Sequence, residues 1–249
     1  MIKEINLNLH TKSNIGMQPT TQFHPGRVRQ TIEPNLYSGS LLHHFSIPEI
    51  SSYQKNSYAF IFRIVDIFLS FFAVSFLLLT IPFLWVANRL FDPGPLFYNQ
   101  KRVGKNGKGF TMYKFRSMVV NAEKDGAQFT TQNDDRITRV GIFLRKTRLD
   151  ELPQAVNVLK GDMSFIGPRP ERPEFVKILA QKDDEYTQRL LVKPGLTGWA
   201  QVKYKYTDNI EDALVKLRYD LYFLRNRNIK MDFEIIARTI WIVISKQGT

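Results

Sequence analysis

The feature that most constrains this chain is an uncharged, apolar run from Ile67 to Ala87. Its 21 residues are enough to cross a hydrocarbon layer of roughly 30 Å as a helix. The run follows a long polar segment, which excludes a cleaved signal peptide. A core helix of a soluble protein is the alternative, but the run is longer than an uncharged core helix usually is. The run therefore predicts a membrane segment that binds a lipid bilayer.

Whether this segment spans the bilayer depends on Pro82 and on the flanking charges. Pro82 removes one backbone N–H donor, which predicts a kink about two-thirds of the way along the run. Basic residues lie on both sides, with Arg63 before the run and Arg89 and Arg102 after it, so the charge asymmetry expected of a spanning helix is weak. The residues alone favour a spanning helix and a re-entrant helix about equally.

Cysteine and histidine usage limits the chemistry. The chain has no cysteine, which excludes disulfides, a thiolate nucleophile and a cysteine-ligated metal. All four histidines lie within the first 44 residues (His10, His24, His43 and His44). Chemistry later in the chain must therefore use carboxylates, Lys, Arg, Ser, Thr or Tyr. A metal there would take oxygen ligands, which favours Mg²⁺ or Ca²⁺.

The charge balance indicates anionic partners. The formal net charge is +12, and most of it follows the first 58 residues. Nucleic acid, an anionic membrane surface and phosphorylated small molecules are the candidate partners.

The distribution of polar, apolar and turn-forming residues divides the chain into three regions. Residues 1–55 are polar without sustained periodicity, which predicts a flexible extension. Residues 56–90 contain the membrane segment. Residues 91–249 carry short elements separated by Gly and Pro, followed by helical patterns, including one apolar stripe (Ile210, Leu214, Leu217, Leu221 and Leu224). The last apolar stretch, FEIIARTIWIVIS, is too short for a confident span and is expected to lie on the membrane or pack on its helix.

Residues on either side of Gly104-Lys105-Asn106-Gly107 predict a two-strand hairpin with a Gly/Asn turn. These glycines fit neither the GxxxxGK[ST] nor the GxGxxG phosphate-binding pattern. Lys114 and Arg116 flank Phe115 and are expected to point to one side of an extended chain. They could therefore hold one anion together.

The densest chemistry lies in residues 143–175. Asp150 and Glu151 precede a predicted helix, with Pro153 in its first turn. Taken alone, this pair is typical of helix capping, with Asp150 as the cap and Glu151 in the first turn.

Basic neighbours favour a functional role for the pair. Arg145 and Arg148 precede it, and Arg169 lies between two prolines further on. Arginines bind phosphate oxygens, and two adjacent carboxylates can hold Mg²⁺ while one of them attacks. The segment thus predicts a site that binds and cleaves a diphosphate.

Three strings carry a resemblance to a known family: PGPLFYNQKRVGKNGKGFTMYKFRSM, TRVGIFLRKTRLDELPQAVNVLKGDMSFIGPRPERPEF and VKPGLTGWAQV. From Phe62 to about Ser245 the chain closely resembles the bacterial sugar transferases, the monotopic polyprenol-phosphate phosphoglycosyl transferases. The insert NAEKDGAQFTTQNDDRITRVG and the ending YDLYFLRNRN most resemble the exopolysaccharide-associated branch, which transfers sugar phosphates to undecaprenyl phosphate.

This resemblance implies a reaction and roles for the site residues. A sugar-1-phosphate would pass from a UDP-sugar to polyprenyl phosphate, with release of UMP and with Mg²⁺ as cofactor. Asp150 matches the family nucleophile, which forms a covalent aspartyl-phosphosugar, and Glu151 matches its partner in Mg²⁺ binding. Arg145 and Arg169 match phosphate-binding arginines, with Lys114 or Arg116 in the basic element beside them.

The resemblance also implies a fold and a location. We expect a mostly α, α/β fold with a re-entrant membrane helix, a small hairpin and amphipathic interfacial helices. The helix would break at Pro82 and leave the catalytic domain, residues 91–249, on the cytosolic side of the bacterial inner membrane. The family's Ser-Pro pair usually lies about one turn earlier relative to Asp66, whereas here Thr80-Ile81-Pro82 stands. Many relatives also carry transmembrane helices and a further domain before this segment, so the chain is either a compact or a truncated form.

Two other functions remain as alternatives. A membrane-tethered module could bind nucleic acid or anionic lipid through its basic face, but this does not explain two carboxylates among arginines. The second alternative is an inactive scaffold for assembly, but the presence of both Asp150 and Glu151 argues against it. We therefore expect no nucleic-acid partner. The sugar and the oligomeric state, including a homo-oligomer, stay open. VKPGLTGWAQV either lines the donor pocket or forms turns.

Overall fold

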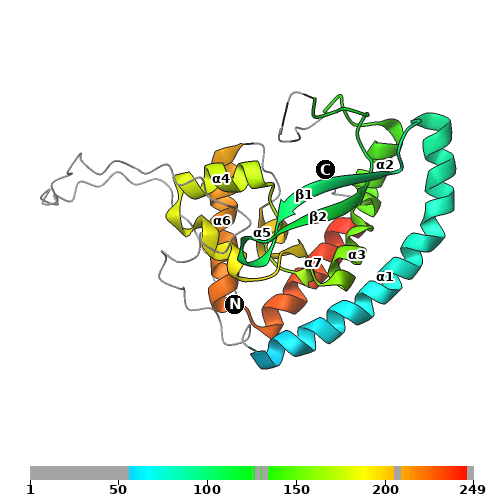
Figure 1. Ribbon diagram of the computed structural model, residues 1–249. Helices are drawn as coiled ribbons and strands as arrows, with labels where there is room; N and C mark the ends of the chain where they lie inside the picture. Colours follow the sequence, from blue (N-terminus) through cyan, green and yellow to red (C-terminus); the bar gives the residue numbers. More distant parts are fainter. Residues whose placement is uncertain (1–55, 125, 127–129, 131–133, 205–208, 246–249) are drawn as a thin grey trace, which may run out of the picture. The chain divides into compact units, whose positions relative to one another are not determined.

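A computed structural model describes residues 56–124, 126, 130, 134–204 and 209–245. The chain divides into two units, and all described residues belong to the larger one, 34–249. The extension predicted over residues 1–55 lies outside the described residues. Within the described part, helices predominate over two small two-stranded sheets (Figure 1), which confirms the mostly helical α/β class.

In chain order the elements are α1 (Asn56–Phe91), β1 (Phe97–Val103), the 3₁₀ turn η3 (Lys105–Gly107), β2 (Gly109–Phe115), α2 (Arg139–Thr147), the 3₁₀ turn η4 (Leu149–Glu151), α3 (Gln154–Lys160), β3 (Ser164–Ile166), α4 (Pro173–Lys182), the 3₁₀ segment η5 (Asp184–Leu191), β4 (Gly195–Thr197), α5 (Trp199–Lys203), α6 (Ile210–Asn226) and α7 (Ile229–Ile244).

Helix α1 contains the apolar run. Tyr58–Phe91 is long and apolar enough to cross a membrane, and most of its large apolar side chains are exposed, Phe83 by 78%. Its buried side chains recur every four or seven residues along one face (Asp66, Ser70, Leu77, Leu84 and Asn88). A helix with one partly polar buried face and otherwise exposed apolar side chains is suited to lipid on its outer side.

The structure differs from the break predicted at Pro82, because α1 continues through this residue. Figure 1 shows α1 as a continuous, curved helix. Leu77 and Leu84, on either side of Pro82, pack into one core cluster with Phe115 and Leu144. This shared packing holds both halves of the helix on the same surface, so the missing N–H bends the helix without interrupting it.

Polar contacts hold the N-terminal part of α1 to α3 and β3. Arg63 donates to the carbonyls of Val158 and Leu159 at the end of α3, both at 2.6 Å. Three residues later, Asp66 accepts hydrogen bonds from Ser164 Oγ (3.1 Å) and from the backbone N–H of Phe165 (3.0 Å). A cation at a helix C-terminus is stabilised by the free carbonyls there.

The hairpin prediction is confirmed. Strands β1 and β2 pair antiparallel from Phe97–Phe115 to Val103–Gly109. Asn106 (φ 56°) and Gly107 (φ 75°) lie in the left-handed region, which is the conformation that Asn and Gly supply in such turns. Phe110 and Met112 of β2 pack on Val158 and Met163, so the hairpin lies against α3.

The C-terminal helices form the rest of the core. In the predicted stripe of α6, Leu217 and Leu221 are buried with Val176 and Tyr186, and Leu224 is buried with Ile235 of α7. Helix α7 also has an exposed apolar face (Ile229, Phe233, Ile236, Ile240 and Ile244). These positions recur at spacings of three and four, as on an amphipathic helix.

Candidate active site

Asp150 and Glu151 lie in a tight turn between two helices. Helix α2 ends at Thr147, and Arg148 then adopts the left-handed conformation (φ 60°), which reverses the chain into η4. Leu149 and Leu152 flank the two carboxylates and pack into the cluster that also contains Phe115. The apolar flanks thus fix the turn while the carboxylates line a cavity.

The capping role considered for Asp150 and Glu151 is wrong. Helix α3 begins at Gln154, and Pro153 occupies its cap position without a side-chain hydrogen bond. The two carboxylates belong to the preceding 3₁₀ turn instead. Neither the position of this turn nor its contacts fit an ordinary helix start.

Glu151 is held by two cations. Its Oε1 atom lies 2.5 Å from Arg169 Nη2 and 3.3 Å from Lys114 Nζ of β2. Burial would raise the pKa of Glu151, but the charges of Arg169 and Lys114 outweigh it and hold this pKa well below its usual range. Burial also lowers the pKa of Lys114 to about 8, against the attraction of Glu151. Glu151 is therefore a permanent anion at neutral pH.

Asp150 is buried without such a partner. Its side chain is largely buried, and its Oδ1 atom has no hydrogen-bond partner among the described residues. Burial, followed by the neighbouring charge of Glu151, raises the pKa of Asp150 to about 6. Two adjacent carboxylates thus have pKa values shifted in opposite directions, an arrangement typical of sites where they perform different tasks.

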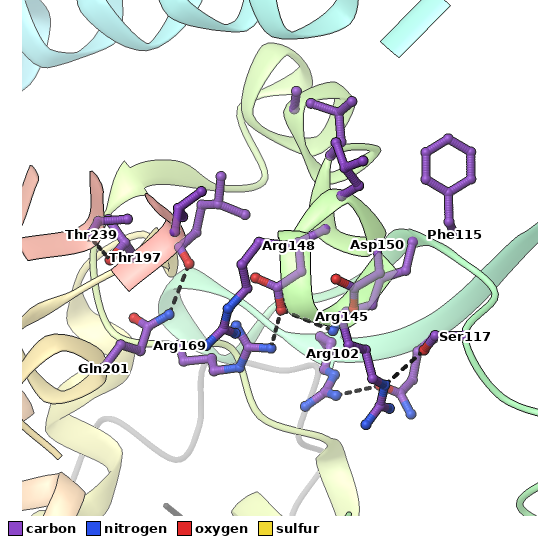
Figure 2. A pocket seen from close by; sticks show the side chains of 18 of the residues that line it. Arg102, Phe115, Ser117, Arg145, Arg148, Asp150, Arg169, Thr197, Gln201 and Thr239 are labelled. Carbon is purple, nitrogen blue, oxygen red and sulfur yellow. Dashed lines mark hydrogen bonds and ion pairs between the residues drawn. The ribbon is translucent and has the colours of Figure 1, made fainter. Parts of the chain in front are cut away.

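Several of the arginines that line the cavity lie around this pair. Figure 2 shows Arg102, Arg145, Arg148 and Arg169 gathered near Asp150. Arg145, from α2, donates from Nε to Ser117 Oγ at 3.0 Å. Six predicted site residues therefore line one cavity (Lys114, Arg116, Arg145, Asp150, Glu151 and Arg169). Arg102 and Ser117 carried no distinguishing sequence signal, because only their tertiary position brings them here.

Alternation along the strand predicted that Arg116 and Lys114 could hold one anion together. Arg116 lines the same cavity as Lys114, but its guanidinium is occupied by other partners. Strand β2 ends at Phe115, and the Arg116 side chain turns toward the end of α1. It donates to Asn88 Oδ1 and the Pro95 carbonyl, both at 2.7 Å, and to the carbonyl of Asp92. Arg116 therefore joins the end of α1 to the hairpin.

Replacing Arg116 by Met is expected to lower stability far more than donor recognition. The change leaves Asn88 and backbone carbonyls without their donor, which should destabilise the fold by about 2–4 kcal/mol. Thermal unfolding in detergent and the KM for the sugar donor would be measured together. Lys114→Met is the matched variant, with the opposite expected pattern. A large rise in KM for Arg116→Met alone would restore its predicted phosphate role.

The segment around Arg169 is held by close backbone packing. Strands β3 and β4 pair parallel, and glycines permit this approach. A methyl group at Gly195 would lie 2.1 Å from the Gly167 nitrogen, and one at Gly198 would lie 2.2 Å from the Gly167 carbonyl oxygen. The glycines of VKPGLTGWAQV thus serve close packing, and residues between and after them, Thr197 and Gln201, line the cavity.

Gly195→Ala is expected to destabilise the protein by about 1–3 kcal/mol, because the backbone of Gly167 must move to admit the methyl group. The movement would also displace Arg169 and lower activity. Gly161→Ala is the control: its φ of +90° is unfavourable for alanine, but the nearest atom is 3.5 Å away. Unfolding midpoints and turnover would be compared. Equal activity in the two variants would contradict the proposed displacement of Arg169.

The cavity, of about 2010 Å³, has walls of different character. Its charged end holds Asp150 and Glu151. Apolar side chains from α1 and α7 also line it (Ile61, Val65, Leu69, Phe233, Ile236 and Ile240). Neutral polar side chains line it as well. Figure 2 shows Gln201 near Thr197 and Thr239, whose hydroxyl oxygens lie 2.7 Å apart. One cavity thus offers surfaces for anionic, apolar and hydroxyl-bearing groups.

The carboxylates of Asp150 and Glu151 suit Mg²⁺ only when a substrate supplies further oxygen ligands. Within the described ranges, no group of three His, Cys, Asp or Glu residues could hold a metal. The free oxygen of Asp150 is available, whereas one oxygen of Glu151 already contacts Arg169 and Lys114. Mg²⁺ commonly uses one or two carboxylates together with substrate phosphates and water. The pair fits such a site when a diphosphate is present.

The chain resembles one family of known proteins over most of its length. The family model described as bacterial sugar transferase matches residues 57–246. The chain is 43% identical over 191 residues to the UDP-N-acetylgalactosamine-undecaprenyl-phosphate N-acetylgalactosaminephosphotransferase of Aeromonas hydrophila, covering 77% of this chain and 45% of that protein. It is 41% identical over 158 residues to the UDP-glucose:undecaprenyl-phosphate glucose-1-phosphate transferase of Escherichia coli (strain K12), covering 63% and 34%.

A third relative is similar in length. The chain is 40% identical over 184 residues to the exopolysaccharide production protein PSS of Rhizobium leguminosarum bv. phaseoli, covering 72% of this chain and 92% of that protein. By contrast, the chain spans less than half the length of the first two relatives. The family match includes every element from α1 to α7. The chain belongs to the bacterial sugar transferase family.

Proposed function

We propose that this protein transfers a sugar-1-phosphate from a UDP-sugar to polyprenyl phosphate, in the form of undecaprenyl phosphate, and so begins assembly of an exopolysaccharide or glycoconjugate. The observation that carries the proposal is the pair Asp150 and Glu151, buried among cations in a cavity that also has apolar walls. The names of the relatives from Aeromonas hydrophila and Escherichia coli support the same class of donor and acceptor.

The transfer would proceed in two displacements at one phosphorus atom. A carboxylate oxygen of Asp150 attacks the phosphorus that carries the sugar. The bond from this phosphorus to the bridging oxygen breaks, and UMP leaves with that oxygen. A phosphate oxygen of the polyprenyl phosphate then attacks the same phosphorus and displaces the Asp150 carboxylate. The products are polyprenyl-diphosphate-sugar and the unchanged enzyme.

The cations would offset the repulsion between the carboxylate and the diphosphate. Arg145 and Arg169 would contact phosphate oxygens, and Lys114 would stay with Glu151. Phosphoryl transfer depends mainly on positioning and charge stabilisation, which such groups supply. When bound with the diphosphate, Mg²⁺ held by Asp150 and Glu151 would supply further charge neutralisation.

The contacts of α1 support a re-entrant topology. Arg63 and Asp66 bind α3 and β3. At the other end, Asn88 binds Arg116, and Asp92, the residue after α1, accepts from the N–H of Val140. Both parts of the helix thus contact one catalytic region, which a helix crossing to the far side could not do. We place this region on the cytosolic face of the bacterial inner membrane, where the apolar faces of α1 and α7 would contact lipid.

Purified protein in detergent would test the reaction. With Mg²⁺, undecaprenyl phosphate and a panel of UDP-sugars, we expect UMP release with at least one donor. Omission of the acceptor should limit release to about one UMP per enzyme, since the intermediate cannot turn over. Absence of UMP with every donor would sink the transferase proposal. Chelation of Mg²⁺ should stop UMP release. An unchanged rate of UMP release would show that the reaction does not need the metal.

A labelling experiment would test the topology. Because the chain lacks cysteine, single cysteines at positions 50 and 105 can be probed with an impermeant thiol reagent in inverted and right-side-out vesicles. We expect both positions to react from the cytosolic face alone. Labelling from opposite faces would show that α1 spans the membrane.

A further inference from the structure

We propose that Arg189, held by Asp220, is a positioning residue that sets the place of Arg169. Arg189 lies in η5, and its Nη2 atom donates to the backbone carbonyl of Arg169 at 2.7 Å. The side chain of Arg169 extends toward Glu151, and its Nη2 atom lies 2.5 Å from Glu151 Oε1. Arg169 is therefore held at its backbone by one buried charge and at its guanidinium by another.

The segment that carries Arg169 needs such support because of its prolines. Pro168 and Pro170 flank Arg169 and have no N–H to donate. Only the carbonyl groups of these positions can anchor the backbone. The N–H of Gly195 donates to the carbonyl of Pro168 at 2.9 Å, and Arg102 donates to that of Pro170 at 3.0 Å. Arg189 supplies the corresponding bond for the residue between them.

The guanidinium of Arg189 is buried, and each of its nitrogen atoms has a hydrogen-bond partner. Its Nε donates to Asp220 Oδ2 at 2.9 Å, and its Nη1 donates to the Tyr186 hydroxyl at 2.9 Å. Relative exposure is 6% for Arg189 and 2% for Asp220. Each nitrogen of the guanidinium therefore has a defined partner. Nη2 lies between the Arg169 carbonyl and Asp220 Oδ2, which is 2.8 Å away, so Asp220 helps to fix its position.

Stability alone does not explain this ion pair. A buried pair pays a large desolvation penalty, and well-packed apolar side chains of similar volume are often at least as stable. The surroundings suit such a replacement, since Tyr186 lies in the apolar cluster with Leu190, Leu217 and Leu221. What an apolar pair could not supply is the hydrogen bond to the Arg169 carbonyl. We assign the buried charges to that bond.

The inference rests on the proposed function, because the effect on rate follows from the phosphate-binding role of Arg169. A displacement of about 1 Å in a positioned group can lower a rate by about 10²-fold. Arg189 touches neither Asp150 nor Glu151 in any described contact. Its influence on the reaction should therefore pass through Arg169 alone, and a double-mutant cycle can detect this.

The variant for the cycle is Arg189→Gln combined with Asp220→Asn, which removes both buried charges together. In a chain that keeps Arg169, we expect the single-turnover rate of UMP release to fall by about 10–100-fold. In the Arg169→Ala background, the same double change should lower the residual rate by less than about threefold. Equal losses in both backgrounds would overturn the proposal, because a general structural effect is additive.

Two controls separate positioning from loss of stability. Tyr186→Phe removes one bond of Arg189 but keeps those to Asp220 and Arg169, so its rate should stay within about threefold of wild type. Leu217→Ala, on the same helix as Asp220, removes apolar packing and should lower the unfolding midpoint with little coupling to Arg169. Coupling of equal size for Leu217→Ala would contradict the specific role of Arg189.

Hydrogen exchange gives a readout that does not require activity. The amides of Gly167, Arg169, Glu171 and Arg172 should exchange faster in Arg189→Gln/Asp220→Asn than in Leu217→Ala at matched stability. Unchanged exchange there would overturn the inference even if the wild-type protein released no UMP. A wild-type protein without UMP release would instead refute the proposed function, so the two failures are distinguishable.

Discussion

Asp150→Asn is expected to reduce UMP release by on the order of 10⁴-fold or more, as loss of a covalent nucleophile does in other enzymes. The amide has nearly the same shape but cannot attack phosphorus. With wild-type protein and no acceptor, mass spectrometry of the peptide that contains Asp150 should show the added sugar-phosphate. The variant should show no adduct.

The control for Asp150→Asn is Asp162→Asn, a partly exposed aspartate just after α3 that does not line the cavity. This variant should keep its rate within about twofold of wild type, since it removes one acidic charge without touching the site. Full activity of Asp150→Asn would end the covalent assignment, although the enzyme class could survive. A sugar-phosphate adduct on another residue would identify that residue as the nucleophile.

Arg169→Ala is expected to lower the rate of UMP release by about 10²–10³-fold, the usual loss on removing one group that stabilises developing charge. The change also deprives Glu151 of its nearest cation, at 2.5 Å. Because the loss concerns charge in the transition state, kcat should fall more than KM rises. Steady-state kinetics with donor concentration varied would separate the two constants.

Arg169→Lys should recover part of this loss, since it restores a charge without the bidentate geometry of guanidinium. Arg218→Ala serves as the control, because Arg218 is an exposed arginine that pairs with Asp183 and Glu185 on the surface. It should have no measurable effect on rate. If Arg169→Ala raised only KM, the residue would bind the ground state and the transition state equally.

Local patterns were sufficient for α1, the β1–β2 hairpin and α6, and for grouping the charged residues around Asp150 and Glu151. The uncharged run from Ile67 predicted α1, the Gly-Asn turn predicted the hairpin, and the leucine stripe predicted α6. The pair Asp150 and Glu151 was found from its basic neighbours, although capping was the simpler interpretation of the pair alone. Such patterns succeed because they depend on neighbours within a few residues.

Long-range contacts were the part that could not be predicted. Alternation along β2 put Arg116 beside Lys114, but the strand ends one residue earlier and the end of α1 captures its guanidinium. The backbone approach of Gly167 to Gly195 joins segments far apart in the sequence. Arg189 and Asp220 had no motif, and only folding brings them to the Arg169 carbonyl.

The contacts of α1 also bear on the order of events during synthesis. Asp66 pairs with Phe165, which is 99 residues further along the chain, and Arg63 pairs with Val158 after 95 residues. At about 5–20 residues per second, the ribosome delivers these partners roughly 5–20 s after the helix. Until then a carboxylate and a guanidinium on α1 lack the groups that satisfy them, which disfavours their entry into lipid. With the proposed re-entrant topology, membrane insertion of the helix and folding of residues 91–249 would therefore be coupled steps.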